Sequence, residues 1–155
     1  MMRATGQRGF SLVELLIVVA IIGIIAAIAV PGIMSSRRAA NEASAVSSLR
    51  TLASVEITYR LTVGQGAFGT LDDLRVAGMI DPVLASATTV ANAKSGYVFA
   101  LALTAGSTGY QTGAAPANEY AGTRNFSSDA TGIILSHPRA IASPPSTTAG
   151  GTPLQ

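Results

Sequence analysis

The chain has 155 residues, of which 48% are hydrophobic and 12% charged, and it contains no cysteine. It therefore has no disulfide framework, no thiol nucleophile and no cysteine-bearing metal site. The formal net charge is +2, but Arg3 and Arg8 precede a long apolar run, and without them eight basic side chains face eight acidic ones. This composition predicts one modest domain plus a membrane segment, and no general nucleic-acid surface.

The apolar run is long enough to cross a bilayer as a helix. Phe10–Met34 comprises 25 residues, whereas about 20 suffice for a span. Its only ionisable side chain is Glu14. Arg37 and Arg38 follow the run, so arginine pairs flank it on both sides and charge alone sets no orientation. A short basic N-terminus commonly stays cytoplasmic, which would place the remaining domain outside.

The helical pattern continues beyond the membrane segment through residues 35–63, which contain neither glycine nor proline. Val46, Leu49, Ala53 and Ile57 recur at spacings of three and four, which predicts an apolar stripe, with Glu42 among the polar positions. A helix over residues 10–63 would be about 80 Å long, far longer than a membrane requires. Its second half is therefore expected to be amphipathic and to carry a domain.

The remaining residues predict a small head. A short helix is expected after Thr70, a favourable N-cap residue, and before Gly78. Strand-like stretches separated by turn signals predict an antiparallel meander over residues 96–103, 110–115, 123–128 and 132–137. The Pro-, Gly-, Ser- and Thr-rich segment 143–155 is expected to be mobile. The fold class is thus α+β, a long N-terminal helix on a small antiparallel sheet.

Two interpretations of the N-terminal apolar run do not involve a filament. In the first, the apolar run is a cleaved secretory signal with cleavage before Val30. A signal core gains nothing from Glu14, however, and such cleavage would leave a Val-Pro stub on the long helix. In the second, the run is a plain single-span anchor, and Glu14 reaches the membrane interface.

The third interpretation accounts for every unusual feature. The stretch "RGFSLVELLIVVAIIGIIAAIAVPG" combines a short basic leader ending in Gly9, then Phe10, Glu14 four residues later, an unbroken apolar run, and Pro31. It resembles the N-terminus of type IV pilins and of the related type II secretion pseudopilins. The fold that this resemblance implies is the pilin-like lollipop.

The resemblance also implies processing and assembly. Prepilin peptidase would cleave between Gly9 and Phe10 on the cytoplasmic side, and the new Phe10 amine would be methylated. Glu14 lies one helical turn from that amine. In a filament it could meet the amine of a neighbouring subunit, and because an unpaired buried charge is costly, the pair would set the register. Gly23 and Pro31 weaken the helix, and residues 23–31 are expected to melt on assembly.

These inferences together predict how the chain is organised and what it does. The predicted parts are a leader (1–9), a transmembrane or filament-core half-helix (10–34), an amphipathic half-helix (35–63), a head (64–142) and a flexible tail (143–155). The predicted function is a structural subunit of a type IV pilus-like filament, a helical homo-oligomer. The expected partners are prepilin peptidase and the inner-membrane assembly machinery. The subunit would lie in the inner membrane, head periplasmic, and then in an extracellular filament.

The alternative function is a pseudopilin of a type II secretion system. Many type IV pilins close a C-terminal loop with a disulfide, which this chain cannot form. Major pseudopilins usually carry an aspartate-proline-tryptophan-glycine stretch in a calcium loop, whereas here Asp81 and Pro82 are followed by Val83. That departure counts against the alternative without removing it.

An enzyme is not expected. His137 is the only histidine, and it is expected to be exposed to solvent near the tail. Asp72 and Asp73 are adjacent in a predicted helix and are better explained as partners of its N-terminal dipole. Asp129 falls in a predicted turn, where aspartate is favoured for local hydrogen bonds. The sequence therefore predicts no catalytic residue, no metal site and no cofactor.

Overall fold

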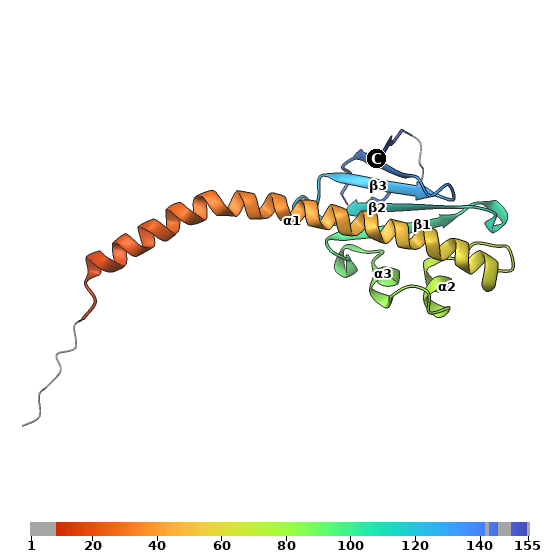
Figure 1. Ribbon diagram of the computed structural model, residues 1–155, viewed down its shortest axis with the longest axis horizontal. Coiled ribbons are helices and arrows are strands. Elements are labelled where there is room, and N and C mark those ends of the chain that lie inside the picture. The colour runs from red at the N-terminus through yellow and green to blue at the C-terminus, as the bar shows by residue number, and fades with distance from the viewer. Residues whose placement is uncertain (1–8, 142, 146–149, 155) are drawn as a thin grey trace, which may run out of the picture. The chain divides into compact units, whose positions relative to one another are not determined.

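The structure is a computed structural model that describes residues 9–141, 143–145 and 150–154. The chain divides into two compact units, Met1–Ser36 and Arg37–Gln155. One continuous helix, α1 (Leu12–Thr62, 51 residues), contributes to both (Figure 1). In the first unit the described residues form the start of this helix and the three non-helical residues, 9–11, that precede it. The long N-terminal helix predicted from the sequence is confirmed.

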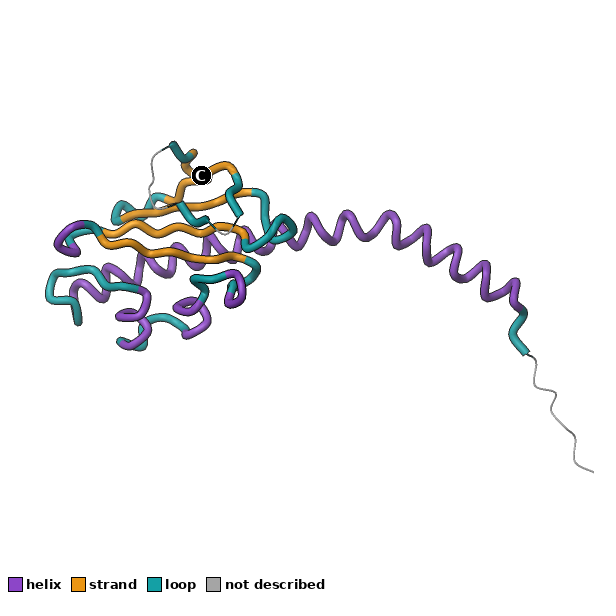
Figure 2. Tube along the Cα trace, turned by 180° about the vertical axis from the view of Figure 1, so that it is seen from behind, coloured by secondary structure: helices purple, strands orange, loops and turns teal. Residues whose placement is uncertain are grey.

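The second unit contains a five-stranded antiparallel sheet in the order β1-β2-β3-β4-β5 (Figure 2). The strands are β1 (Tyr97–Leu103), β2 (Tyr110–Pro116), β3 (Arg124–Asp129), β4 (Ile134–Pro138) and β5 (Thr152–Pro153). Neighbouring strands follow one another in sequence, as in a meander, with Phe99 opposite Ala114 and Ala114 opposite Phe126. The predicted α+β class and the four predicted strands are confirmed, and the structure adds a fifth.

Short helices lie between α1 and the sheet, and one further 3-10 turn, η2 (Ala105–Ser107), connects β1 to β2. The former are α2 (Leu71–Val76), α3 (Pro82–Ser86) and the 3-10 turn η1 (Val90–Asn92). Thr70 and Asp73 cap α2 reciprocally, which bears out the predicted N-cap. Asp81 caps α3 through its carboxylate, 2.7 Å from the Leu84 N–H. The sequence analysis missed α3, whose signal was an aspartate followed by proline at the first helical position.

The second half of α1 packs on one face of the sheet, but not through the stripe predicted from the sequence. Leu49 is buried as expected, whereas Ile57 is 52% exposed. The predicted stripe is therefore wrong in phase by about one residue. The buried positions of α1 are Glu42, Ala45, Ser48, Leu49, Leu52 and Glu56. Two glutamates lie on this face, and a search for apolar periodicity necessarily skips them.

The described parts of the C-terminal segment contact the sheet, while the expected mobility of residues 143–155 as a whole stays a prediction. Thr152 pairs with Ser136 to form β5 against β4, and the Leu154 N–H donates to the Ile134 carbonyl at 2.9 Å. Asn125 Nδ2 donates to the Ser143 carbonyl at 3.0 Å. A strand of two residues needs backbone partners and little apolar surface, so a polar composition gave no sign of it. Residues 142, 146–149 and 155 of the predicted tail lie outside the described residues.

Candidate assembly site

Ser11 and Glu14 cap the start of α1 in a variant of the capping box, in which the serine hydroxyl bonds to the second rather than the third helical N–H. The Ser11 hydroxyl accepts a hydrogen bond from the Val13 N–H at 3.3 Å, and Glu14 Oε2 accepts one from the Ser11 N–H at 2.9 Å. These bonds satisfy backbone donors that the first turn of a helix leaves open. Glu14 thus has a role within a single chain, which the sequence analysis did not recognise although the Ser-x-x-Glu spacing signals it.

The predicted processing site is exposed to solvent. Gly9 and Phe10 are both exposed, with 81% of Phe10 accessible. The leader residues 1–8 lie outside the described part of the chain. Cleavage between Gly9 and Phe10, and methylation of Phe10, stay predictions.

The apolar surface of the first unit is uncovered. All residues from 10 to 36 are exposed. Among the described residues, one helix, α1, has the length and composition to cross a membrane, and its most apolar stretch is not buried. A surface of this kind is not stable in water, so lipid or other helices must cover it.

The predicted weak segment forms regular helix here. α1 continues through Pro31 without a break. A Cβ added at Gly23 would meet no heavy atom within 4 Å, so packing inside the chain does not require this glycine. The hydroxyls of Ser35 and Ser36 both donate to the Gly32 carbonyl, at 2.9 and 3.0 Å. The melting of residues 23–31 on assembly stays a prediction.

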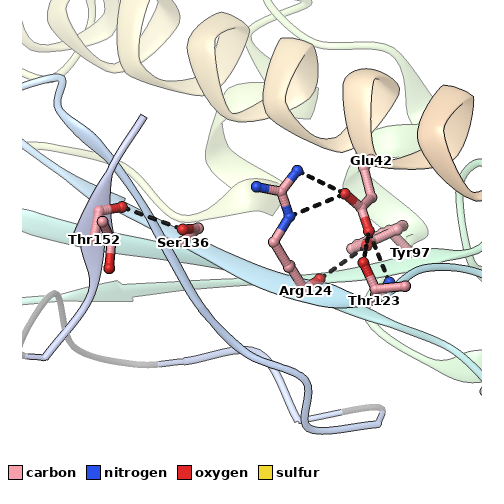
Figure 3. Close-up of polar contacts among 6 residues, drawn as sticks. All are labelled: Glu42, Tyr97, Thr123, Arg124, Ser136 and Thr152. Carbon is pink, nitrogen blue, oxygen red and sulfur yellow. Dashed lines mark hydrogen bonds and ion pairs between the residues drawn. The ribbon is translucent and has the colours of Figure 1, made fainter. Parts of the chain in front are cut away.

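In the second unit, a buried carboxylate joins α1 to the sheet (Figure 3). Glu42 Oε1 accepts hydrogen bonds from the Thr123 N–H at 2.7 Å and the Thr123 hydroxyl at 2.6 Å. Its Oε2 accepts two from Arg124, from Nε at 3.1 Å and Nη2 at 2.8 Å. The Tyr97 hydroxyl donates to the Arg124 carbonyl at 2.9 Å. This network fixes the β2–β3 loop to the helix.

The hydrogen bonds decide the charge of Glu42. Burial alone raises the pKa of this carboxyl, but the bonds from Thr123 and Arg124 outweigh burial, and the pKa lies below its usual value. Glu42 is therefore ionised at neutral pH. Sequence analysis placed it on the polar face because its partners are about 80 positions away in the chain.

A second buried carboxylate, Glu56, lies near the other end of the sheet and is poorly satisfied. It is fully buried. Its Oε2 accepts the Gly69 N–H at 3.1 Å, while Oε1 has no hydrogen-bond partner among the described residues. Burial raises the pKa of Glu56 to about 7; the Gly69 bond partly offsets the rise and the Asp73 charge adds to it. Burial, with the charges of Glu56 and Asp129, raises the pKa of the nearby Tyr110 to about 12.

The one histidine is half-buried rather than exposed, so that expectation is wrong. His137 Nε2 lies 2.6 Å from the Ser127 hydroxyl, because both residues lie on paired strands. Ser127 is 1% exposed, so a substrate has no route to this serine. A serine nucleophile also needs a group that orients the histidine, and among the described residues no third side chain forms a hydrogen bond with His137. The pair is best explained as a hydrogen bond within the sheet.

The aspartates serve local structure. Asp72 pairs with Arg75 at 2.7 Å, Asp73 caps α2, and Asp129 accepts from the Thr131 N–H in the β3–β4 turn at 2.9 Å. In the described part of the chain no three His, Cys, Asp or Glu side chains gather as they would around a metal ion. These aspartates therefore form an ion pair, cap a helix or stabilise a turn.

A long N-terminal apolar helix and a five-stranded antiparallel sheet are the parts of a pilin-like subunit. The prokaryotic N-terminal methylation motif matches residues 5–30. With this motif the chain is a prepilin-type protein, similar at its N-terminus to type IV pilins and pseudopilins, which are structural rather than enzymatic proteins.

The proteins similar to this chain include several named type II secretion system core protein G. The protein of Escherichia coli K12 is 35% identical over 104 residues, which is 63% of this chain and 66% of the relative. Those of Klebsiella michiganensis and Pectobacterium carotovorum are each 38% identical, over 39% and 36% of this chain and over 42% and 35% of the relative. The chain thus matches less than two thirds of each relative's length. No solved structure matches it significantly.

Proposed function

We propose that the chain is a pseudopilin, a subunit that assembles through α1 into the filament of a type II secretion system. The observation that carries this proposal is the resemblance to the core protein G relatives, over a chain whose N-terminal helix leaves its whole apolar surface uncovered. The sequence analysis gave a type IV pilus-like filament as its main hypothesis and the pseudopilin as its alternative. The relatives favour the alternative.

The exposed apolar half of α1 fits a subunit that is found first in the membrane and then in the filament. In the inner membrane, lipid covers residues 10–34 and keeps a pool of subunits ready. In the filament, the same surface packs against helices of other copies. Little hydrophobic free energy separates the two, because lipid tails and neighbouring helices are similarly apolar. Assembly therefore depends on external machinery and on specific contacts.

Glu14 supplies the specific contact. Cleavage after Gly9 creates an amine at Phe10, and the Glu14 carboxylate of one subunit pairs with the Phe10 amine of the next. An unpaired carboxylate in an apolar filament core costs several kcal/mol, so a subunit out of register is disfavoured. Gly23 and Pro31 allow the segment between them to unwind as the helices pack.

This function has defined partners and locations. Prepilin peptidase removes the leader and the inner-membrane secretion machinery adds the subunit to a filament of identical copies. The leader is cytoplasmic and the head periplasmic. A type IV pilus subunit is the second candidate, favoured by the Asp81-Pro82-Val83 sequence, which lacks the tryptophan usual in the calcium loop of major pseudopilins.

Two substitutions at Glu14 test the assembly step. Glu14→Gln keeps an acceptor for the Ser11 N–H and so keeps the capping box, but removes the charge. Glu14→Ala removes both. The full-length variants are expressed with the secretion machinery, and filament incorporation is measured by cross-linking between copies. Membrane flotation checks insertion, and mass spectrometry of the N-terminal peptide checks processing. Asp72→Asn, at an exposed carboxylate of the head, is the control.

We expect both Glu14 variants to insert and to begin at a methylated Phe10, yet to fail to incorporate. If Glu14→Gln assembles like the unchanged chain, the charge pair is not needed and only the capping role remains. A chain beginning at Val30 would overturn the family's processing pathway for this protein. Filaments recovered by shearing the cell surface, rather than from the periplasm, would favour the pilus candidate.

A further inference from the structure

A group of cationic and amphipathic side chains surrounds the β2–β3 loop, residues 117–123. Arg38 on α1 lies close enough to Tyr120 for its charge to act on the phenol. Arg139, which follows β4, donates from Nη1 to the Glu119 carbonyl at 3.0 Å and to the Gly122 carbonyl at 3.5 Å. Segments far apart in the sequence thus meet at one end of the head.

The loop is held firmly beside the first turns of the head portion of α1. Asn41 Nδ2 donates to the Ala121 carbonyl at 2.9 Å, and Glu42 accepts from both the N–H and the hydroxyl of Thr123. Arg37 lies three residues beyond Met34, the last residue of the apolar run, which is about 5 Å along a helix. The loop is therefore fixed against the turns of α1 that begin the second unit.

The side chains at this end are those that favour a membrane interface. Tyr120 is 58% and Ile141 50% exposed, and Arg37 is exposed. The Arg38 Nε is buried and has no hydrogen-bond partner among the described residues. Glu42 neutralises Arg124, so the charges that remain are three arginines against Glu119. Tyrosine and arginine are enriched at the level of lipid headgroups, where an apolar body and a polar tip are both accommodated.

We propose that Arg37, Arg38, Arg139, Tyr120 and Ile141, the headgroup collar, form a docking surface for anionic phospholipid headgroups. The collar rests the head on the membrane while the subunit waits for assembly. Charge complementarity selects anionic over zwitterionic lipid, because a negatively charged leaflet attracts basic groups close to it. The inference rests on the proposed function only in requiring that the apolar run be inserted in a membrane.

The chain has no native cysteine, so single labels report the position of the head without background. Ala140→Cys places an environment-sensitive fluorophore inside the collar, and Ala130→Cys places one in the β3–β4 turn at the opposite end of the sheet. The full-length protein is reconstituted in phosphatidylcholine vesicles and in phosphatidylcholine–phosphatidylglycerol vesicles. Quenching by a headgroup-attached spin label measures how closely each label approaches the lipid.

We expect the Ala140 label to be quenched more strongly in the anionic vesicles, and the Ala130 label to be unaffected. Each arginine removed should lower the docked-to-undocked ratio about fivefold. Arg37→Glu is the cleanest variant, because its side chain is exposed, and Arg50→Glu on the exposed side of the same helix is the matched control. Salt should weaken the difference by screening.

Three outcomes would overturn the proposal. Equal quenching in both vesicles would mean that lipid charge plays no part. Equal quenching of the Ala130 and Ala140 labels would mean that the head lies on the membrane without a preferred end. Release by inorganic phosphate beyond that by chloride at equal ionic strength would assign the arginines to a free anion. Insertion is followed by flotation and filament incorporation by cross-linking, so a failed collar and a failed assembly site are distinguishable.

Discussion

The buried Glu56 makes the head of this protein less stable as pH rises through the neutral range. The pKa of this carboxyl is raised from 4.5 to about 7 in the folded chain. Between these values the unfolded chain has lost a proton that the folded chain keeps, so the free energy of unfolding falls with increasing pH. A rise of roughly 2.5 pKa units corresponds to a loss of about 3 kcal/mol. Above the window both states are ionised and the loss is constant.

Glu56→Gln removes the titration while keeping an acceptor for the Gly69 N–H. The unchanged chain should lose about 3 kcal/mol relative to this variant between about pH 4 and pH 8. Urea unfolding of the full-length protein in detergent measures this, followed by near-ultraviolet circular dichroism of the buried Tyr97 and Tyr110. Glu119→Gln, at an exposed carboxylate, should leave the pH dependence unaltered. If the curves of the unchanged chain and Glu56→Gln run parallel, Glu56 is not the titrating group and the argument from its burial is wrong.

Three further predictions concern other contacts of the helix and the sheet. Glu42→Gln should lower the free energy of unfolding by about 2 kcal/mol at neutral pH, because charge-assisted hydrogen bonds are lost. Arg124 contributes little to this loss, because its side chain is half exposed and its charge is therefore screened. Urea unfolding measures the change. The pKa of Glu42 is lowered in the folded chain, so the unchanged chain should lose this advantage as pH falls below about 4.5. Gly122→Ala places a Cβ onto the Tyr97 hydroxyl and should lower the free energy of unfolding by about 1–3 kcal/mol, seen in the same assay, whereas equal stability would show that the loop yields. Gly23→Ala should stabilise α1 by about 1 kcal/mol and, if residues 23–31 unwind on assembly, reduce the cross-linked filament fraction without altering insertion.

The sequence predicted those features that depend on composition and local chemistry. The apolar run, its length, the N-cap at Thr70 and the four meander strands each follow from a few neighbouring residues. So does the capping box at Ser11 and Glu14, whose spacing was visible although the sequence analysis used Glu14 only for assembly. Local signals are read reliably when the interaction they describe is itself local.

The features that the sequence analysis missed depend on distant partners. Glu42 is on the buried face of α1 because Thr123 and Arg124 satisfy it, and nothing near it in the sequence announces this. Counting apolar residues therefore shifted the predicted stripe toward Ile57, which the structure leaves half exposed. The strand β5 and the half-burial of His137 likewise depend on backbone pairing across the sheet, which a polar composition does not reveal.

The capping role of Glu14 changes how its assembly role should be understood. A carboxylate that already accepts the Ser11 N–H is not an unsatisfied group searching for a partner. Under the proposed function, joining the filament exchanges this internal bond for an ion pair with the Phe10 amine of another copy. The net gain is the difference between the two, which is smaller than the ion pair alone. Such an exchange protects the charge while the subunit is in the membrane and keeps the step reversible. It also explains why Glu14→Gln is the decisive variant: the amide keeps the internal bond and loses only the partner outside the chain.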